Sequence, residues 1–294
     1  FLNIDRYDLD DEYYNNYIKN IDAVSDEKVI EMANRYIKPD NALIVVVGNA
    51  SEIAPALSNI AEVKYYDIYG NPTDPPMMDL PDGVTLETVM NGYVEAKGGE
   101  KAMKKIKSMK IEYEGSMGEN TVKTSTTWRK PNYLKETFSI VGMMHQTSKF
   151  DGERGIIMSP RGNQELEGKD LELKKIQSNF FYLANYDEYG IDAELKGLEM
   201  MNGSPAYKVE MNYNDQKWIA FFDQESNMLI AETSFSETPQ GTQSQTVTYS
   251  DFVEKSGVKF AQKQSINVMG RELTFQATNI EVNPKVSKKE FSIE

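Results

Sequence analysis

The sequence predicts an α+β protein: a small α/β N-terminal part, then a large antiparallel curved sheet or half-barrel with helices. Before residue 71, apolar residues recur at helical spacing around one short β-branched run. Four of the eleven prolines then fall within residues 71–84, which is typical of a semi-rigid linker. Beyond residue 107 the chain alternates between strand-length segments and turns. We therefore divide it into residues 1–70, 71–84 and 85–294.

The N-terminal part is expected to contain three helices and two strands. The best-marked helix has Ser25 at its N-cap, an apolar stripe that includes Val29 and Met32, and Pro39 beyond its end. Helices are also expected over residues 10–20 and 51–59 and a second strand over residues 63–66. Residues 42–47 are apolar throughout and β-branched at four of six positions, so they predict a buried strand.

The C-terminal part is expected to open with a helix that has Thr85 at its N-cap and ends at Gly98. A short lysine-rich helical turn follows, and one further helix is expected over residues 168–181. Strands are expected over residues 108–114, 121–129, 133–140, 145–150, 155–159, 193–201, 206–213, 217–222, 228–235, 244–253, 258–268 and 272–282. So many strands in about 210 residues predict one curved sheet or an open barrel.

Composition excludes several classes of function. The chain has no cysteine and one histidine, which rules out thiolate chemistry and a two-histidine metal site. Its 46 acidic and 32 basic residues give a net charge of −14, which argues against nucleic acid as a partner. No apolar run approaches the roughly 18 residues that a membrane span needs.

No residue pattern predicts catalysis. His145 is expected on a strand, without a nucleophile and carboxylate in evident reach. Glu112 and Glu114 share one face of a strand. That spacing is compatible with the carboxylate pair of a glycosidase, but solvent-facing carboxylates on an ordinary sheet have the same spacing. The acidic residues within 5–12 lack the central glycine of a calcium loop and suit a helix start. We therefore expect no catalytic residue, no metal ligand and no cofactor in this chain.

Residues 9–70 resemble the C-terminal end of M16 (pitrilysin and insulinase-type) zinc peptidases. The matching segments are Leu9-Asp10-Asp11-Glu12-Tyr13-Tyr14, Val24-Ser25-Asp26-Glu27-Lys28-Val29, Ala33-Asn34-Arg35-Tyr36-Ile37-Lys38-Pro39-Asp40-Asn41, Ile44-Val45-Val46-Val47-Gly48-Asn49 and Tyr66-Asp67-Ile68-Tyr69-Gly70. The family's H-x-x-E-H zinc motif is absent. The resemblance implies a non-catalytic tail, zinc only in the catalytic part of a parent protein, and the remainder of that peptidase as a partner.

Residues 85–294 resemble the LolA/LolB-type lipoprotein carriers. The matching segments are Gly92-Tyr93-Val94-Glu95-Ala96-Lys97-Gly98-Gly99, Trp128-Arg129-Lys130-Pro131-Asn132-Tyr133, Phe150-Asp151-Gly152-Glu153-Arg154-Gly155, Phe222-Asp223-Gln224-Glu225-Ser226-Asn227-Met228-Leu229, Tyr249-Ser250-Asp251-Phe252 and Asn283-Pro284. The resemblance implies a half-barrel whose concave face holds a plugging helix and an apolar cavity for acyl chains. It also implies a periplasmic or cell-envelope location of the Gram-negative type.

Two sets of residues are candidates for binding. Aromatic and aliphatic side chains of the expected strands and helix could line the cavity, and we name Trp128, Phe138, Ile140, Met143, Phe180 and Phe221. A lysine-rich turn could contact anionic lipid headgroups or an acidic partner through Lys101, Lys104 and Lys105, although a solvated helix face has the same composition.

Two functions follow from these candidates. In the first, the domain binds an apolar ligand such as a lipid, an acyl chain or a lipoprotein, a lipidated peptide, or a partner protein. In the second, it is a structural or protein-interaction module that closes or positions the peptidase and holds no small molecule. An open apolar pocket favours the first and a fully packed sheet interior the second.

Overall fold

A computed structural model describes residues 2–10, 12–38, 42–58, 60–75, 78–141, 144–201, 203–238, 241–268 and 271–293. The expected cavity residue Met143 lies outside these ranges. The chain divides into two compact units, Phe1–Gly48 and Asn49–Glu294.

The first unit is helical. It contains α1 (Leu2–Tyr7), α2 (Tyr13–Asp22) and α3 (Asp26–Tyr36). The predicted N-cap of α3 is confirmed, because the Ser25 hydroxyl accepts a hydrogen bond from the Lys28 amide at 3.3 Å. The apolar stripes of α2 and α3 are largely exposed.

The buried strand expected over residues 42–47 is wrong. These residues form no strand, and Leu43 and Val47 are 87% and 95% exposed. The backbone of a strand forms its hydrogen bonds with a neighbouring strand. The described residues of this unit form no other strand with which residues 42–47 could pair. The sequence predicted a small α/β N-terminal part, but the structure shows a set of helices followed by an extended apolar segment.

The second unit begins with a helix and a loop that reaches the sheet. After α4 (Ala50–Ser58), the strand expected over residues 63–66 is reduced to one bridge between Tyr66 and Pro72. The proline-rich segment expected as a linker forms a second bridge, between Met78 and Leu198. There the Met78 amide donates to the Leu198 carbonyl at 2.7 Å, so the segment is attached to the edge of the sheet.

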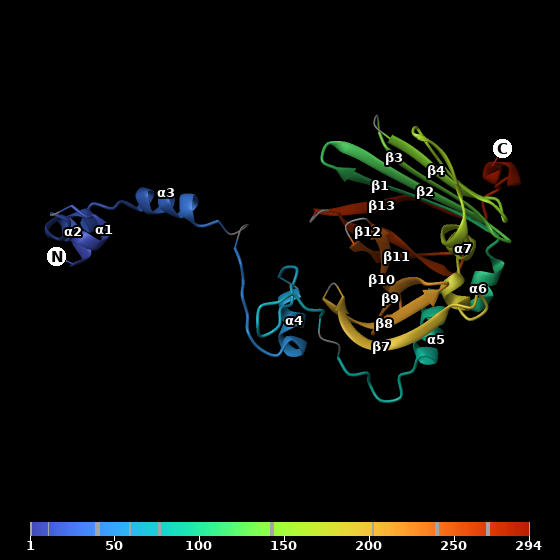
Figure 1. Cartoon of the computed structure of the whole chain (residues 1–294), viewed down its shortest axis with the longest axis horizontal. Coiled ribbons are helices and arrows are strands. Elements are labelled where there is room, and N and C mark those ends of the chain that lie inside the picture. Colours follow the sequence, from blue (N-terminus) through green and yellow to red (C-terminus); the bar gives the residue numbers. More distant parts are fainter. Residues whose placement is uncertain are drawn as a thin grey trace. The chain divides into compact units, whose positions relative to one another are not determined.

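A single antiparallel sheet of thirteen strands forms most of this unit, as the sequence predicted (Figure 1). The strands are β1 (Ser108–Met117), β2 (Asn120–Arg129), β3 (Tyr133–Ile140), β4 (Met144–Phe150), β5 (Gly155–Ser159), β6 (Gly162–Leu166), β7 (Asp192–Met201), β8 (Ser204–Tyr213), β9 (Gln216–Asp223), β10 (Leu229–Thr238), β11 (Gly241–Lys255), β12 (Val258–Val268) and β13 (Arg271–Val282). Their order is β6-β5-β4-β3-β2-β1-β13-β12-β11-β10-β9-β8-β7.

This order makes the sheet two meanders joined where β1 pairs with β13. The edge strands β6 and β7 are consecutive along the chain, so the segment between them must travel from one edge of the sheet to the other. It contains α7 (Gly168–Gln177) and the 3₁₀ helix η2 (Tyr182–Asn185). Figure 1 shows the sheet curling on itself, with α5, α6 and α7 at one end of the strands.

The helices α5 (Leu86–Lys97) and α6 (Glu100–Lys105) precede the sheet. Thr85 and Thr88 form a reciprocal capping box at the start of α5, which confirms the expected N-cap. Gly98 ends the helix at a φ of 132°, a conformation that favours glycine. Beyond the last strand, the 3₁₀ helix η3 (Lys288–Phe291) buries the Phe291 ring beside Tyr133.

Candidate functional site

The two faces of the curved sheet differ in character. Side chains alternate along a strand, so neighbouring residues such as Phe221 and Phe222 point to opposite faces. Phe222 packs with Tyr93 of α5, at 5.1 Å between ring centroids, so its face is the inner one that the helices cover. Phe221 belongs to a separate outer cluster with Ala206, Ile219 and Ala231.

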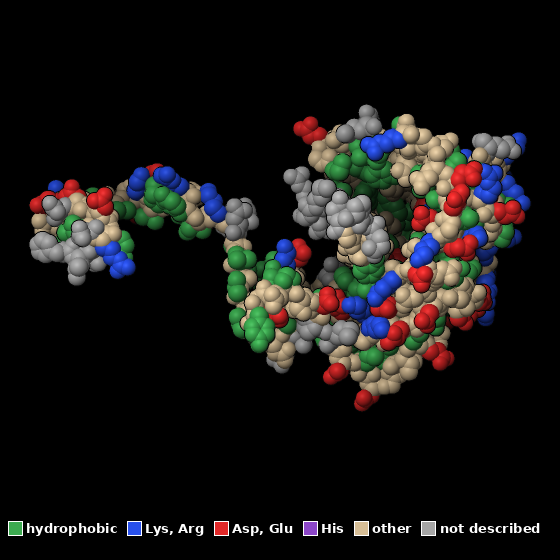
Figure 2. All heavy atoms as spheres, in the orientation of Figure 1, with side chains coloured by type: hydrophobic (Ala, Val, Ile, Leu, Met, Phe, Trp, Pro, Cys, Tyr) green, Lys and Arg blue, Asp and Glu red, His purple; other side chains and the backbone are tan. Residues whose placement is uncertain are grey.

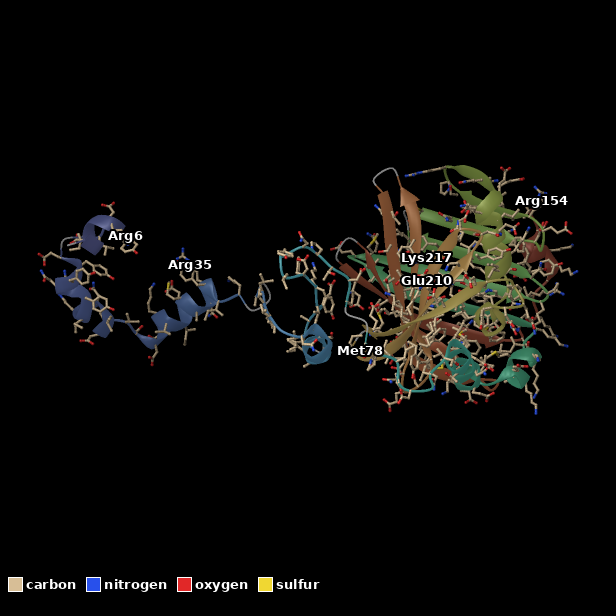
Figure 3. The ribbon with its side chains drawn as sticks, turned by 60° about the horizontal axis from the view of Figure 1, so that its bottom comes forward. Arg6, Arg35, Met78, Arg154, Glu210 and Lys217 are labelled. Carbon is tan, nitrogen blue, oxygen red and sulfur yellow. The ribbon has the colours of Figure 1, made fainter. Side chains whose placement is uncertain are left out.

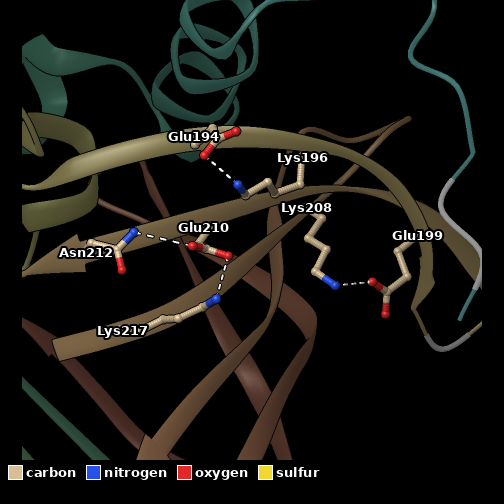
Figure 4. Close-up of polar contacts among 7 residues, drawn as sticks. All are labelled: Glu194, Lys196, Glu199, Lys208, Glu210, Asn212 and Lys217. Carbon is tan, nitrogen blue, oxygen red and sulfur yellow. Dashed lines mark hydrogen bonds and ion pairs between the residues drawn. The ribbon is translucent and has the colours of Figure 1, made fainter. Parts of the chain in front are cut away.

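The outer face of β7, β8 and β9 carries paired charges (Figure 4). Lys208 lies 2.7 Å from Glu199, and Lys217 lies 2.6 Å from Glu210. Figure 3 labels Glu210 and Lys217 next to each other, and Figure 4 shows their side chains pointing toward each other. Because Lys208 and Lys217 already have carboxylate partners, neither cation is free to bind a charged ligand.

The inner face is hollowed and mostly apolar (Figure 2). The strand register places Phe138 and Ile140 of β3 on the same face as Trp128 and Val122 of β2. Phe138, Ile140 and Trp128 pack against the inner core cluster yet remain partly exposed. Figure 2 shows hydrophobic side chains lining this hollow beneath β1 to β4. Apolar side chains inside the fold thus still present surface to solvent.

The structure brings four of the six predicted cavity residues together. Trp128, Phe138, Ile140 and Phe180 pack in one inner cluster, and the Trp128 and Phe180 rings meet at 4.7 Å. The exception among the described residues is Phe221, whose outer-face position points it away from this cluster. Phe221 and Phe222 are consecutive phenylalanines on one strand, so the sequence alone does not show which of the two faces inward.

One small pocket lies beside this cluster. It has a volume of about 30 Å³, enough for a water molecule, and Trp128, Phe180 and Met109 are among its lining residues. An acyl chain does not fit there. The open hollow is therefore the part of the inner face with room for a ligand.

A polar group lies on the inner face, and nothing in the sequence analysis identified it. Glu232 of β10 accepts hydrogen bonds from the Tyr182 hydroxyl of η2 at 2.9 Å and the Tyr249 hydroxyl of β11 at 2.8 Å. Burial raises the pKa of the Glu232 carboxyl, and the two hydroxyl donors and the Lys97 charge partly offset this. Burial also raises the pKa of both tyrosines.

Lys97, the last residue of α5, is a cation whose pKa the Glu232 charge influences. Its Nζ lies 5.6 Å from the Phe180 ring centroid and 5.4 Å from the Phe260 ring centroid. Burial lowers the pKa of Lys97 to about 8, although the Glu232 charge acts in the opposite direction. We call Lys97, Glu232, Tyr182 and Tyr249 the polar centre.

Other candidates from the sequence lie elsewhere. His145 is an exposed residue of β4 whose Nε2 lies 3.2 Å from the Thr147 hydroxyl. Glu112 and Glu114 pair with Lys110 at 2.8 Å and Lys123 at 3.0 Å, as ordinary surface carboxylates do.

The lysine-rich turn is α6, and its predicted contact residues are all exposed; Lys104 forms an ion pair with Glu100. These residues are Lys101, Lys104 and Lys105.

No group of three histidine, aspartate and glutamate side chains that could hold a metal occurs in the described part of the chain. Within the same ranges, no helix combines the length and apolar character of a membrane span.

Comparison with known proteins gives structural likenesses only. No family model and no curated protein matches the sequence. A LolA superfamily protein from Nitrosomonas europaea is 12% identical, with 71% of this chain and 98% of that chain covered and a TM-score of 0.48. A DUF1329 family protein from Desulfovibrio piger is 10% identical, with 71% and 97% covered and a TM-score of 0.46.

A more distant likeness is to the MucA/MucB complex of Pseudomonas aeruginosa, at 12% identity, with 70% of this chain and 61% of that chain covered and a TM-score of 0.26. None of these comparisons shows an M16 peptidase. What is established is the architecture: a large, curved, open antiparallel sheet with a few helices on its inner face.

Proposed function

We propose that the sheet domain binds an acyl chain in the hollow of its inner face. The observation that supports this most is the partial exposure of Phe138, Ile140 and Trp128 on the inner face. Figure 2 shows that this face is hollowed and lined largely by hydrophobic side chains. Large apolar side chains are ordinarily packed out of water when they lie inside a fold. In this domain the three side chains are only partly buried, and an apolar ligand in the hollow would cover the surface that they still expose.

Apolar burial supplies the driving force for this binding. Each Å² of apolar surface removed from water contributes roughly 25 cal/mol, and a flexible chain adapts to an open trough of aromatic rings. No group on the inner face needs to react with the ligand. The domain would act as a carrier or receptor, and we expect no catalytic step and no cofactor.

The wider setting rests on sequence resemblance alone. Residues 9–70 carry the M16-like segments, so we propose that the sheet domain is attached to the non-catalytic end of a cell-envelope M16 peptidase. The exposed apolar segment 42–47 suits a strand whose sheet is completed elsewhere, such as in the rest of that peptidase. The alternative is a domain that positions the peptidase and holds no ligand; the hollowed inner face favours the carrier.

Intrinsic fluorescence tests acyl-chain binding directly. The chain has two tryptophans, Trp128 and Trp218, and both lie on the inner face. A Trp218→Phe variant leaves Trp128 as the reporter, and bromine on an acyl chain quenches an indole only at short range. We expect saturable quenching by a brominated fatty acid. Absence of quenching, together with an unchanged mass in native mass spectrometry, would favour the interaction module.

A further inference from the structure

The Lys97 ammonium is an unusual group to find on the inner face of the sheet. It is partly exposed and surrounded by the Phe180 and Phe260 rings, at 5.6 and 5.4 Å from its Nζ to their centroids. No hydrogen bond or ion pair joins this Nζ to any residue that the structure describes. An ammonium in apolar surroundings is costly unless an acceptor offsets its lost hydration, and ring faces do so only in part.

The neighbouring carboxylate does not supply that acceptor. Both oxygens of Glu232 already accept hydroxyl groups, from Tyr182 at 2.9 Å and from Tyr249 at 2.8 Å. Glu232 raises the pKa of Lys97 through its charge, without a hydrogen bond between the two side chains. The polar centre therefore has a satisfied carboxylate and a cation with three N–H donors directed only at rings and solvent.

We propose that the ligand of the hollow is a long-chain carboxylic acid, with its carboxylate bound to the Lys97 ammonium and its chain along the apolar wall of β2 and β3. This inference rests on the proposed function and adds the headgroup to it. A carboxylate accepts charge-assisted hydrogen bonds from an ammonium, and these are about twice as strong as neutral ones. A neutral ester or alcohol lacks that charge, so it would bind through its chain alone.

The groups that face Lys97 are compatible with a second carboxylate. Glu232 of β10 is the charged group that acts on Lys97, and Tyr182, Tyr249 and Tyr93, from η2, β11 and α5, lie near that carboxylate. Two hydroxyl donors spread the Glu232 charge, and burial favours its protonated form. Both effects weaken the repulsion that a ligand carboxylate would meet.

The test compares myristic acid with myristyl alcohol, which have the same chain and differ in the headgroup. Each is titrated into the full chain and into the Lys97→Met and Lys97→Arg variants at neutral pH, and binding is followed by calorimetry. Lys259→Met is the matched control, because Lys259 is an exposed residue between the inward-facing Val258 and Phe260 of the same sheet.

We expect the unaltered protein and Lys259→Met to bind the acid at least about tenfold more tightly than the alcohol. Lys97→Met should lose that preference while its affinity for the alcohol stays the same, and Lys97→Arg should keep part of it. Equal affinity for acid and alcohol in the unaltered protein would overturn the inference and leave acyl-chain binding intact. Failure of both ligands to bind would overturn acyl-chain binding itself, whatever the variants do.

Discussion

Replacing Gly98 by alanine should detach the end of α5 from the sheet. A Cβ built at Gly98 lies 2.0 Å from the carbonyl oxygen of Gly257. The backbone fixes the position of a Cβ, and the oxygen belongs to the main chain, so neither atom can rotate away. Gly98 also has a φ of 132°, which is strained for any residue with a Cβ. The strain costs about 1–3 kcal/mol and the overpacking a similar amount, so we expect a loss of about 2–6 kcal/mol in the free energy of unfolding.

Gly257→Ala is the matched control, because it lies at the other side of the same contact. Its φ is 77°, and the nearest atom to an added Cβ is the Ala102 Cβ at 3.4 Å, an ordinary contact. Only the left-handed conformation is penalised, by about 1–2 kcal/mol. Urea unfolding followed by circular dichroism measures both variants. A loss at Gly98→Ala no greater than that at Gly257→Ala would refute the proposed packing of α5.

Two further predictions concern charge. Burial lowers the pKa of Lys97 from its ordinary 10.5 to about 8 in the folded protein. Between pH 8 and pH 10.5, Lys97 is therefore more protonated in the unfolded chain than in the folded one. The free energy of unfolding should rise with pH across this range. Lys97→Met should abolish that rise and be more stable than the unaltered protein below pH 8; unfolding curves with the same pH dependence in both proteins would contradict this. Reversing the charge of Lys101, Lys104 and Lys105 on α6 should weaken flotation of the protein with anionic vesicles and leave its flotation with neutral vesicles unchanged. Unchanged flotation with anionic vesicles would refute a membrane-surface role for these lysines.

The sheet could be predicted because its signals are local. Alternation of apolar and polar residues and turn residues between segments mark strands without reference to partners. Twelve of the thirteen strands were expected; the one missed was β6, Gly162–Leu166. Its four exposed residues are followed by one buried leucine, so it lacks the alternation that marked the others. As an edge strand it packs little, and sequence gives no other sign of it.

The strand expected over residues 42–47 failed for the opposite reason. Its local signal was strong, because a β-branched apolar run suits a buried strand. A strand also requires a partner, and partner availability is a property of the whole fold. Leu43, exposed to 87%, shows how far tertiary context overrides propensity.

The candidate binding surface was partly predictable, but its polar centre was not. Aromatic residues of strands were reasonable candidates, yet a bulge between Leu229 and Ala231 changes which residues of β10 face inward. Glu232 therefore reads as an ordinary strand carboxylate in the sequence. Lys97, in the last turn of a helix, reads as a cation that complements the helix dipole. Only the fold brings Glu232 into contact with Tyr182 and Tyr249 and near the Lys97 charge.

The most direct test of acyl-chain binding is quenching of Trp128 in two further variants of Trp218→Phe. Phe138→Ala removes a ring from the hollow, and Phe221→Ala removes a ring of the same size from the outer face. If the hollow binds the chain, brominated fatty acid should quench Trp128 with at least about fivefold weaker affinity in Phe138→Ala and unchanged affinity in Phe221→Ala. Equal affinities in the two variants, or no saturable quenching in either, would contradict binding in the hollow.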